Sequence, residues 1–501
     1  MKNIIILYLF STVSVFAQNA ALDPNFGNSG YSVHTDTSEI TCFIFDSNEN
    51  IISAGVNNQG TGGWHLNITK TNKNGILDTS FGTNGKVTTI IEQSAYPNDI
   101  TVQPDGKIIV VGSIHLVSGG NAGFVVRYNS NGTLDQTFGT NGTYLLASAN
   151  QFYSVLLLSN GSMMLGGNTN NINARGILVK LDTNGIIDTT FGTNGILPLD
   201  SMGFQFTLGK AVLLSDNKIL CIGDENTDST NQKAAYCKID IQGNFDNLFG
   251  QNGKVVTDIY NNLPDTSESL RNVKELPNGA IILEGGVLGQ FYNSNILLKI
   301  NANGSIDTTF GTNGVVNHLY PRIAFEVQPD GKIIIGGTKL LNSNDARYSI
   351  TRFTASGVLD TSFNNGNGFV DINPSLGSDG LQYIKLQAND SLIIGGSSKI
   401  NSVSNFTLAR ILLDTPLSVN EPLEQFIKVY PNPVKDRLFI EDSEGIIKSI
   451  KIFNNTSKLI KTFSEPTESV HKIDTNFANG IYHIIIETKD GRTMNKKIIK
   501  K

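Results

Sequence analysis

Short runs rich in apolar and β-branched residues recur along most of this chain, separated by turn-forming residues. Residues 99–112, Asp-Ile-Thr-Val-Gln-Pro-Asp-Gly-Lys-Ile-Ile-Val-Val-Gly, show the pattern most clearly, and residues 328–334 repeat its centre. A Pro-Asp-Gly turn between β-branched runs is typical of a tight hairpin, because the turn needs a residue that accepts positive φ. The pattern therefore predicts antiparallel strands throughout, with no helical core.

A second pattern recurs seven times: an apolar residue, an aspartate and, three positions later, a phenylalanine. The aspartates are Asp23, Asp78, Asp135, Asp188, Asp246, Asp307 and Asp360, at steps of 53 to 61 residues. A hairpin follows each motif, and its second strand is expected to end at a glycine. These glycines are Gly55, Gly112, Gly167, Gly223, Gly285, Gly337 and Gly396. Each unit holds four short predicted strands, which is the content of a propeller blade.

The two ends of the repeat predict a closed ring. The last unit stops at Asp414 without its Phe-Gly segment, whereas the chain begins with Leu22 to Gly27 and a spare strand, Tyr31–His34. The N-terminal piece can complete the last sheet, and closure leaves no free sheet edge. We therefore predict an all-β fold with a seven-bladed β-propeller over residues 18–414.

The motif residues have a mechanical interpretation. An aspartate in a tight turn accepts hydrogen bonds from backbone N–H groups two residues on, and the phenylalanine has room to be buried between blades. The alternative is calcium binding by the oxygen side chains of residues 182–188. Glycine stands fourth there, not sixth as in an EF-hand loop, and no bidentate glutamate follows. Turn chemistry is favoured, and the sequence assigns no catalytic, cofactor-binding or metal-ligating residue.

With these motifs in place, the chain resembles a known family. The repeated Leu-Asp-x-x-Phe-Gly-x-x-Gly and the two Gln-Pro-Asp-Gly-Lys-Ile-Ile segments at 103–109 and 328–334 are similar to the delta-60 repeat of bacterial exported β-propellers. The resemblance covers Leu22 to about Asp414. Departures are local, such as Asn364 in place of a motif glycine. The family brings no catalytic residues to carry over.

The N-terminus is expected to be a secretory signal peptide over residues 1–17. Lys2 supplies the positive charge, Ile4 to Phe16 is apolar, and Val15-Phe16-Ala17 fits a small-residue cleavage site. The alternative is a retained anchor, but about 20 apolar residues are needed to span a bilayer. No later segment qualifies, so we expect no integral membrane segment in the mature protein.

A linker with two prolines is expected over residues 415–425, before a small antiparallel sandwich over 426–501. Its Tyr430-Pro431-Asn432-Pro433 entry, its Asn479 to Tyr482 strand and its lysine-rich last strand resemble the type A sorting domain of the type IX secretion system. The resemblance implies a Bacteroidota-type bacterium, and handling by the secretion machinery through residues 426–501. It also implies release or attachment at the outer cell surface. The alternative is an ordinary immunoglobulin-like module.

Composition and charge narrow the function classes. Residues 421–501 hold 14 Lys/Arg and 11 Asp/Glu, which leaves 24 basic and 33 acidic residues, a net of −9, in the remainder. An acidic region of this kind lacks the excess of basic residues that is typical of nucleic-acid-binding proteins. The three cysteines do not make a disulfide scaffold. Cys221 and Cys237 lie on neighbouring predicted strands, where buried free thiols are favoured over a cross-strand bridge.

One weak constellation of polar side chains remains. His34 and His318 lie four residues after the last glycine of their motifs, and Asp200 and Asp258 lie five after theirs. A polar ring would form if that strand faced the tunnel. Ring closure instead makes it the outermost strand, so we expect these four side chains at the surface. No zinc-protease, nucleophile-elbow or phosphate-loop motif is present.

The variable loops are better candidates, because propellers carry function on loops over a rigid scaffold. The long ones run over 56–63, 117–121 and 342–345, and Trp64, the sole tryptophan, follows the first. Burial of Trp64 is favoured over sugar stacking. The leading hypothesis is an exported, non-enzymatic module that binds glycan or protein. The alternatives are a polysaccharide hydrolase or lyase and a purely structural surface-layer component, since fold does not choose among them.

Overall fold

The computed structural model describes most of the chain. The described residues are 18–34, 39–58, 63–170, 175–200, 205–226, 232–259, 266–289, 293–318, 324–342, 345–364, 366–375, 378–388, 390–400, 403–416, 426–455, 458–464, 468–489 and 493–501. The expected signal peptide and nearly all of the expected linker lie outside them. The chain divides into two compact units, one up to Thr415 and one over Pro416–Lys501. Every regular element among the described residues is a β-strand, and no helix there is long and apolar enough to cross a membrane.

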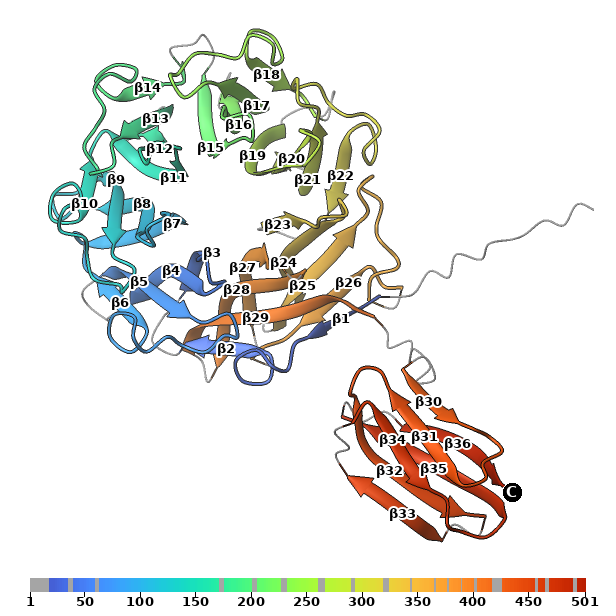
Figure 1. Ribbon diagram of the computed structural model, residues 1–501. Helices are drawn as coiled ribbons and strands as arrows, with labels where there is room; N and C mark the ends of the chain where they lie inside the picture. The colour runs from blue at the N-terminus through green and yellow to red at the C-terminus, as the bar shows by residue number, and fades with distance from the viewer. Residues whose placement is uncertain are drawn as a thin grey trace, which may run out of the picture. The chain divides into compact units, whose positions relative to one another are not determined.

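The first unit is a ring of antiparallel sheets with their innermost strands nearest the ring axis (Figure 1). Three of its four-stranded sheets are, from the inside outward, β3 (Glu39–Phe45), β4 (Ile51–Asn58), β5 (Trp64–Thr71), β6 (Lys86–Thr89); β7 (Ser94–Val102), β8 (Ile108–His115), β9 (Asn121–Tyr128), β10 (Thr143–Leu146); and β11 (Ala149–Leu157), β12 (Met163–Thr169), β13 (Gly176–Leu181), β14 (Ile196–Pro198).

Three further four-stranded sheets continue the ring. They are β15 (Phe206–Leu213), β16 (Ile219–Asn226), β17 (Gln232–Ile239), β18 (Lys254–Thr257); β19 (Thr266–Glu275), β20 (Ile281–Gly289), β21 (Asn293–Ile300), β22 (Val315–His318); and β23 (Ala324–Val327), β24 (Ile333–Asn342), β25 (Asp345–Phe353), β26 (Phe369–Ile372).

The seventh sheet closes the ring with strands from both ends of the propeller. Its inner strands are β27 (Asp379–Leu386), β28 (Ser391–Ile400) and β29 (Val403–Pro416). The N-terminal strands β1 (Gln18–Leu22) and β2 (Tyr31–His34) both pair with β29, and β2 runs in register from Tyr31 opposite Ala409 to His34 opposite Phe406. The predicted closure is therefore confirmed, with seven sheets among the described residues.

The hydrophobic core of the propeller lies between neighbouring blades. Leu66 and Ile68 of β5 join one buried cluster with Val110 and Val126 of the next blade. This packing explains why the strands are apolar on both faces, since each sheet is covered by a neighbour on either side. The motif phenylalanines are at most 3% exposed, as predicted; they are Phe26, Phe81, Phe138, Phe191, Phe249, Phe310 and Phe363.

The second unit is a two-sheet sandwich, as the sequence predicts. One sheet has the order β30 (Ile427–Tyr430), β31 (Arg437–Asp442), β34 (Val470–Asp474), and the other β33 (Leu459–Ser464), β32 (Ile447–Asn454), β35 (Gly480–Thr488), β36 (Thr493–Lys500). Ile440 from the first sheet and Ile452 and Ile484 from the second are fully buried in its own core.

Candidate functional site

The repeated motif forms a joint between blades. In the third copy of the motif, Asp135 Oδ1 accepts a hydrogen bond from the Thr137 backbone N–H at 3.1 Å, as the predicted turn chemistry requires. All seven motif aspartates accept the N–H two residues on, at 2.9 to 3.3 Å. Asp182, the alternative calcium ligand, likewise accepts the Asn184 and Ile186 N–H groups at 2.9 and 2.8 Å.

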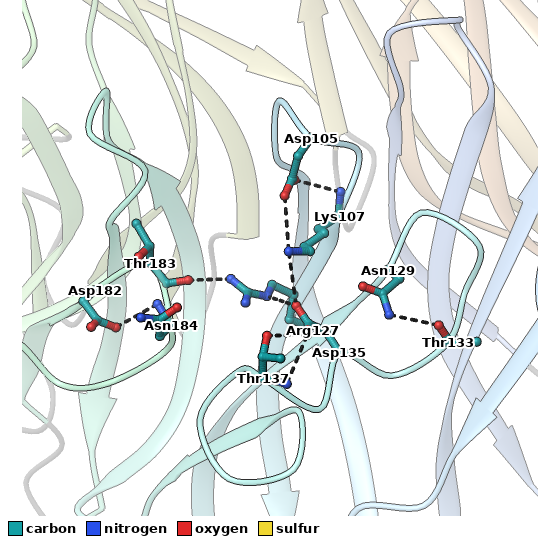
Figure 2. A network of polar contacts seen from close by, with 10 residues as sticks. All are labelled: Asp105, Lys107, Arg127, Asn129, Thr133, Asp135, Thr137, Asp182, Thr183 and Asn184. Carbon is teal, nitrogen blue, oxygen red and sulfur yellow. Dashed lines mark hydrogen bonds and ion pairs between the residues drawn. The ribbon is translucent and has the colours of Figure 1, made fainter.

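A cation completes each joint, and the sequence analysis missed it. Arg127 lies eight residues before Asp135, with Nε 2.8 Å from Oδ2 and Nη1 2.5 Å from the Thr183 carbonyl oxygen of the next blade (Figure 2). Its guanidinium also lies 4.5 Å from the Phe138 ring centre. The other cation–aspartate pairs are Lys70–Asp78, Lys180–Asp188, Lys238–Asp246, Lys299–Asp307, Arg352–Asp360 and Arg410–Asp23. The motif is therefore structural, and the functional site must lie elsewhere.

The sequence candidates on the outer strands do not form a ring. His34 lies in β2 and His318 in β22, while Asp200 and Asp258 follow β14 and β18, so the four stand on the rims of four blades. The expected surface position is wrong for the histidines: His34 is 5% and His318 7% exposed, and His34 stacks on Phe406. Alternate residues of an outer strand face the neighbouring blade rather than water. The aspartates form peripheral ion pairs with Arg175 and Lys233.

Burial lowers the pKa of His318 to about 4. In the unfolded chain the pKa of this histidine is about 6.5. Between pH 6.5 and 4 the imidazole is therefore protonated in the unfolded chain but neutral in the folded protein. Stability is therefore expected to fall by about 3 kcal/mol as the pH drops through that window. Urea unfolding at pH 7 and pH 4.5 measures the loss, which His318→Gln should reduce; an equal loss in the variant would contradict the assignment.

The variable loops are described only in part. Residues 59–62 and 343–344 lie outside the described residues, whereas loop 117–121 is within them and its Val117 is 76% exposed. Trp64 is partly buried in β5, and its backbone N–H donates to Ser94 Oγ at 3.1 Å. Cys221 and Cys237 are opposite each other on β16 and β17 and are buried free thiols.

The inner strands carry a feature that the sequence analysis did not identify. Among the described residues, six of the seven have a β-bulge at the same level of the tunnel wall, and the seventh, β23, is described only from Ala324 onward. The bulged residues are Thr41, Asn98, Tyr153, Gly209, Arg271 and Gln382. Bulges re-aim side chains and occur often beside binding sites. Five of these six residues are polar, and two of them bind the neighbouring blade: Asn98 Nδ2 donates to the Phe152 carbonyl at 2.9 Å, and Gln382 Nε2 donates to Glu39 Oε1 at 2.8 Å.

The predicted strand-end glycines explain the bulges. Gly223 does not end β16 but lies inside it, opposite the bulge, where an added Cβ would be 1.9 Å from the Thr207 carbonyl oxygen. At five other glycines of the series, an added Cβ would likewise lie 2.0 to 2.2 Å from a carbonyl oxygen; they are Gly55, Gly112, Gly167, Gly285 and Gly396. The interpretation as strand ends is therefore wrong: these glycines let the bulged backbone come close.

A cavity of about 370 Å³ lies in the tunnel wall, formed by β15, β19, β23 and β27. Its charged side chains are Lys210, Lys274, Lys385, Glu275 and Glu326. Lys274 Nζ lies 2.5 Å from Glu326 Oε2, so these charges neutralise each other. Within the described part of the chain, no carboxylate forms an ion pair with Lys210 or Lys385.

Burial lowers the pKa of Lys385, while Glu326 opposes the shift and Lys274 adds to it. A cation that is half-buried and lacks a close carboxylate has lost hydration without gaining a partner. The cavity thus presents two ammonium groups that have no carboxylate within ion-pair distance among the described residues, in a propeller whose overall charge is negative. An anion with the right spacing would supply the missing partner.

A second cavity of about 380 Å³ adjoins the first at the level of the bulges. Lys210 and Asn272 line both cavities, so the two lie next to each other. The second is lined in addition by Asn98, Tyr153, Thr207, Leu208, Gly209, Asp224, Ser269 and Arg271. No group of three or more His, Cys, Asp or Glu side chains within the described residues is placed to hold a metal ion.

Comparison with known families agrees with this architecture. A model described as "Domain of unknown function (DUF5122) beta-propeller" matches residues 103–138, 158–191, 287–310 and 328–363. A model described as "Secretion system C-terminal sorting domain" matches residues 428–501. The chain is a delta-60 repeat β-propeller with a type IX sorting domain. Such a propeller is secreted and is either attached to the outer cell surface or released.

Solved structures similar to the delta-60 propeller include an ulvan lyase bound to a GlcA–Rha3S saccharide (12% identity, 77% of this chain and 95% of that chain, TM-score 0.45). A puromycin hydrolase matches with 11% identity over 93% of this chain and 59% of that chain, with a TM-score of 0.42. These values are too low to carry an argument about activity. No curated protein matches the chain.

Proposed function

We propose that the delta-60 propeller is a non-enzymatic binding module that holds an acidic glycan in its tunnel wall. The observation that carries the proposal is a pair of lysines, Lys210 and Lys385, that form no ion pair within the described part of the chain and line a cavity of about 370 Å³. A carboxylate or sulfate group would form charge-assisted hydrogen bonds with them, which are about twice as strong as neutral ones. Tyr383 lines the same cavity, with its ring packed against Phe43 at a centroid distance of 5.1 Å.

The carboxylates of the cavity argue against a glycoside hydrolase. That chemistry commonly needs two carboxylates about 5 to 10 Å apart, one of them free to act as acid or base. Glu326 is neutralised by Lys274, and Glu275 accepts the backbone N–H and the hydroxyl of Ser215 at 2.7 Å each. Both carboxylates are therefore engaged in structural contacts.

A polysaccharide lyase is the second candidate, because one observation favours it. A lyase needs a base that removes the proton beside a uronate carboxyl, and a lysine whose pKa is lowered by burial suits that role. Lys385 has such a lowered pKa. Binding without chain cleavage separates the module from the lyase.

The experiment is to incubate the mature chain with a panel of acidic and neutral polysaccharides, and to score retention together with new reducing and unsaturated ends. Retention of acidic chains without new ends supports the binding module. New unsaturated ends that vanish in Lys385→Met would favour the lyase, and retention of neutral chains alone would contradict the assignment of the lysines.

Replacing a tunnel lysine should weaken binding strongly. Lys210→Met or Lys385→Met is expected to reduce affinity for the retained polysaccharide about tenfold, because each removes one charge-assisted contact worth about 1.5 kcal/mol or more. Lys73→Met is the matched control, since Lys73 is exposed in a turn between β5 and β6. Titration calorimetry measures the three affinities; equal losses in all three variants would show that only net charge matters.

A further inference from the structure

The second cavity contains a buried carboxylate oxygen with no partner. Asp224 of β16 is 6% exposed, and its Oδ1 accepts the Ser269 hydroxyl at 2.9 Å. Its Oδ2 is buried and makes no hydrogen bond within the described part of the chain. Burying an oxygen without a partner costs free energy, so such an atom in a cavity wall is suited to a donor that arrives from outside.

The groups around Asp224 can hold the rest of a sugar residue. Arg271, the bulged residue of β19, is exposed and forms no ion pair with a carboxylate of the described residues. A Cβ on Gly286 would lie 2.5 Å from Arg271 Nη2, so glycine at that position makes room for the guanidinium. Tyr153 and Asn98 line the same cavity. The cavity thus combines an acceptor oxygen without a hydrogen bond, a guanidinium whose charge acts on the nearby carboxylates of Asp224 and Glu284, and neutral polar groups.

We infer that the second cavity is a subsite for one unit of an acidic glycan, in which Asp224 Oδ2 accepts a ring hydroxyl and Arg271 binds the anionic substituent of that unit. This inference rests on the proposed function. Because Lys210 and Asn272 line both cavities, the adjoining unit of the same glycan would lie against Lys210 and Lys385. An anionic chain without hydroxyls would use the lysines and Arg271 but gain nothing from Asp224.

The test compares two probes on the mature full chain: tetragalacturonate, which has carboxylates and hydroxyls, and a short linear polyacrylate, which has carboxylates only. Asp224→Asn keeps an oxygen for the Ser269 hydroxyl but replaces the free acceptor with a donor. We expect this substitution to reduce the affinity for tetragalacturonate about tenfold and to leave the affinity for polyacrylate unchanged. Arg271→Gln, at an exposed position, should weaken both probes.

The matched control is Asp258→Asn, which removes the same charge at the outer rim of the same blade and should change neither affinity. If Asp224→Asn binds tetragalacturonate as the unchanged protein does while Lys385→Met binds it more weakly, the subsite is wrong and the proposed function stands. If Lys385→Met also binds normally, or the unchanged protein binds neither probe, both are wrong. Thermal unfolding of each variant verifies folding, and Arg271→Gln decides the matter should Asp224→Asn fail to fold.

Discussion

A mature chain that begins at Glu39 instead of Gln18 is expected to lose its closed ring. The deletion removes β1 and β2, so β29 becomes an exposed edge strand that can pair with other chains. It also removes Asp23, whose Oδ2 lies 2.7 Å from Arg410, and Phe26, which is fully buried. Taking one partner from a buried ion pair alone costs about 3–5 kcal/mol.

Size-exclusion chromatography and thermal unfolding measure the effect. We expect oligomers or aggregates and a much lower unfolding temperature for the shortened chain. Addition of a synthetic peptide of residues 18–34 should partly restore the elution volume of the unshortened chain, because an extended segment can add to an open sheet edge. A shortened chain that stays monomeric and unfolds at the original temperature would show that closure contributes little.

Ring closure and the aspartate turns could be predicted because both depend on signals that are local in the chain. The turn chemistry of Asp188 needs only the residue two positions on, and the missing outer strand of the last unit is visible as a spare strand at the start. For every motif aspartate except Asp23, which pairs with Arg410, the cation stands eight residues earlier in the sequence, for example Lys180 before Asp188. A charged residue in a predicted strand looks like a solvent-facing one, so its inward role was not apparent.

The glycines opposite the bulges are visible in the sequence, but their interpretation as strand ends was wrong. An isolated glycine within a strand pattern often marks a bulge or a close backbone approach, and Gly223 and its counterparts show that meaning here. The histidines were misplaced for a related reason: an outer strand was treated as a surface strand. His34 and His318 are instead covered by the neighbouring parts of the ring.

The cavity could not be predicted from one sequence. Lys210 and Lys385 are 175 positions apart, in strands whose patterns do not differ from those of the other blades. They line the same cavity only because four inner strands place their residues at matching heights. An acidic propeller therefore contains a local basic site that the net charge conceals. Net charge limits long-range attraction of nucleic acid, but it does not limit what a cavity binds at short range.

The second large effect is expected for glycine at the joint between blades. Gly185 has φ +77°, and an added Cβ would lie 2.5 Å from the Phe138 ring of the preceding blade. Gly185→Ala therefore combines backbone strain of about 1–3 kcal/mol with overpacking of about 1–3 kcal/mol. We expect a total loss of about 3–5 kcal/mol in the free energy of unfolding.

Gly119→Ala is the matched control, because Gly119 has φ +89° but nothing lies within 4 Å of its added Cβ. It should show the backbone strain alone, about 1–2 kcal/mol. The difference between the two variants in urea unfolding isolates the contact between Phe138 and the neighbouring turn. If both variants lose the same free energy of unfolding, the contact between Gly185 and the Phe138 ring contributes little to the stability of the propeller.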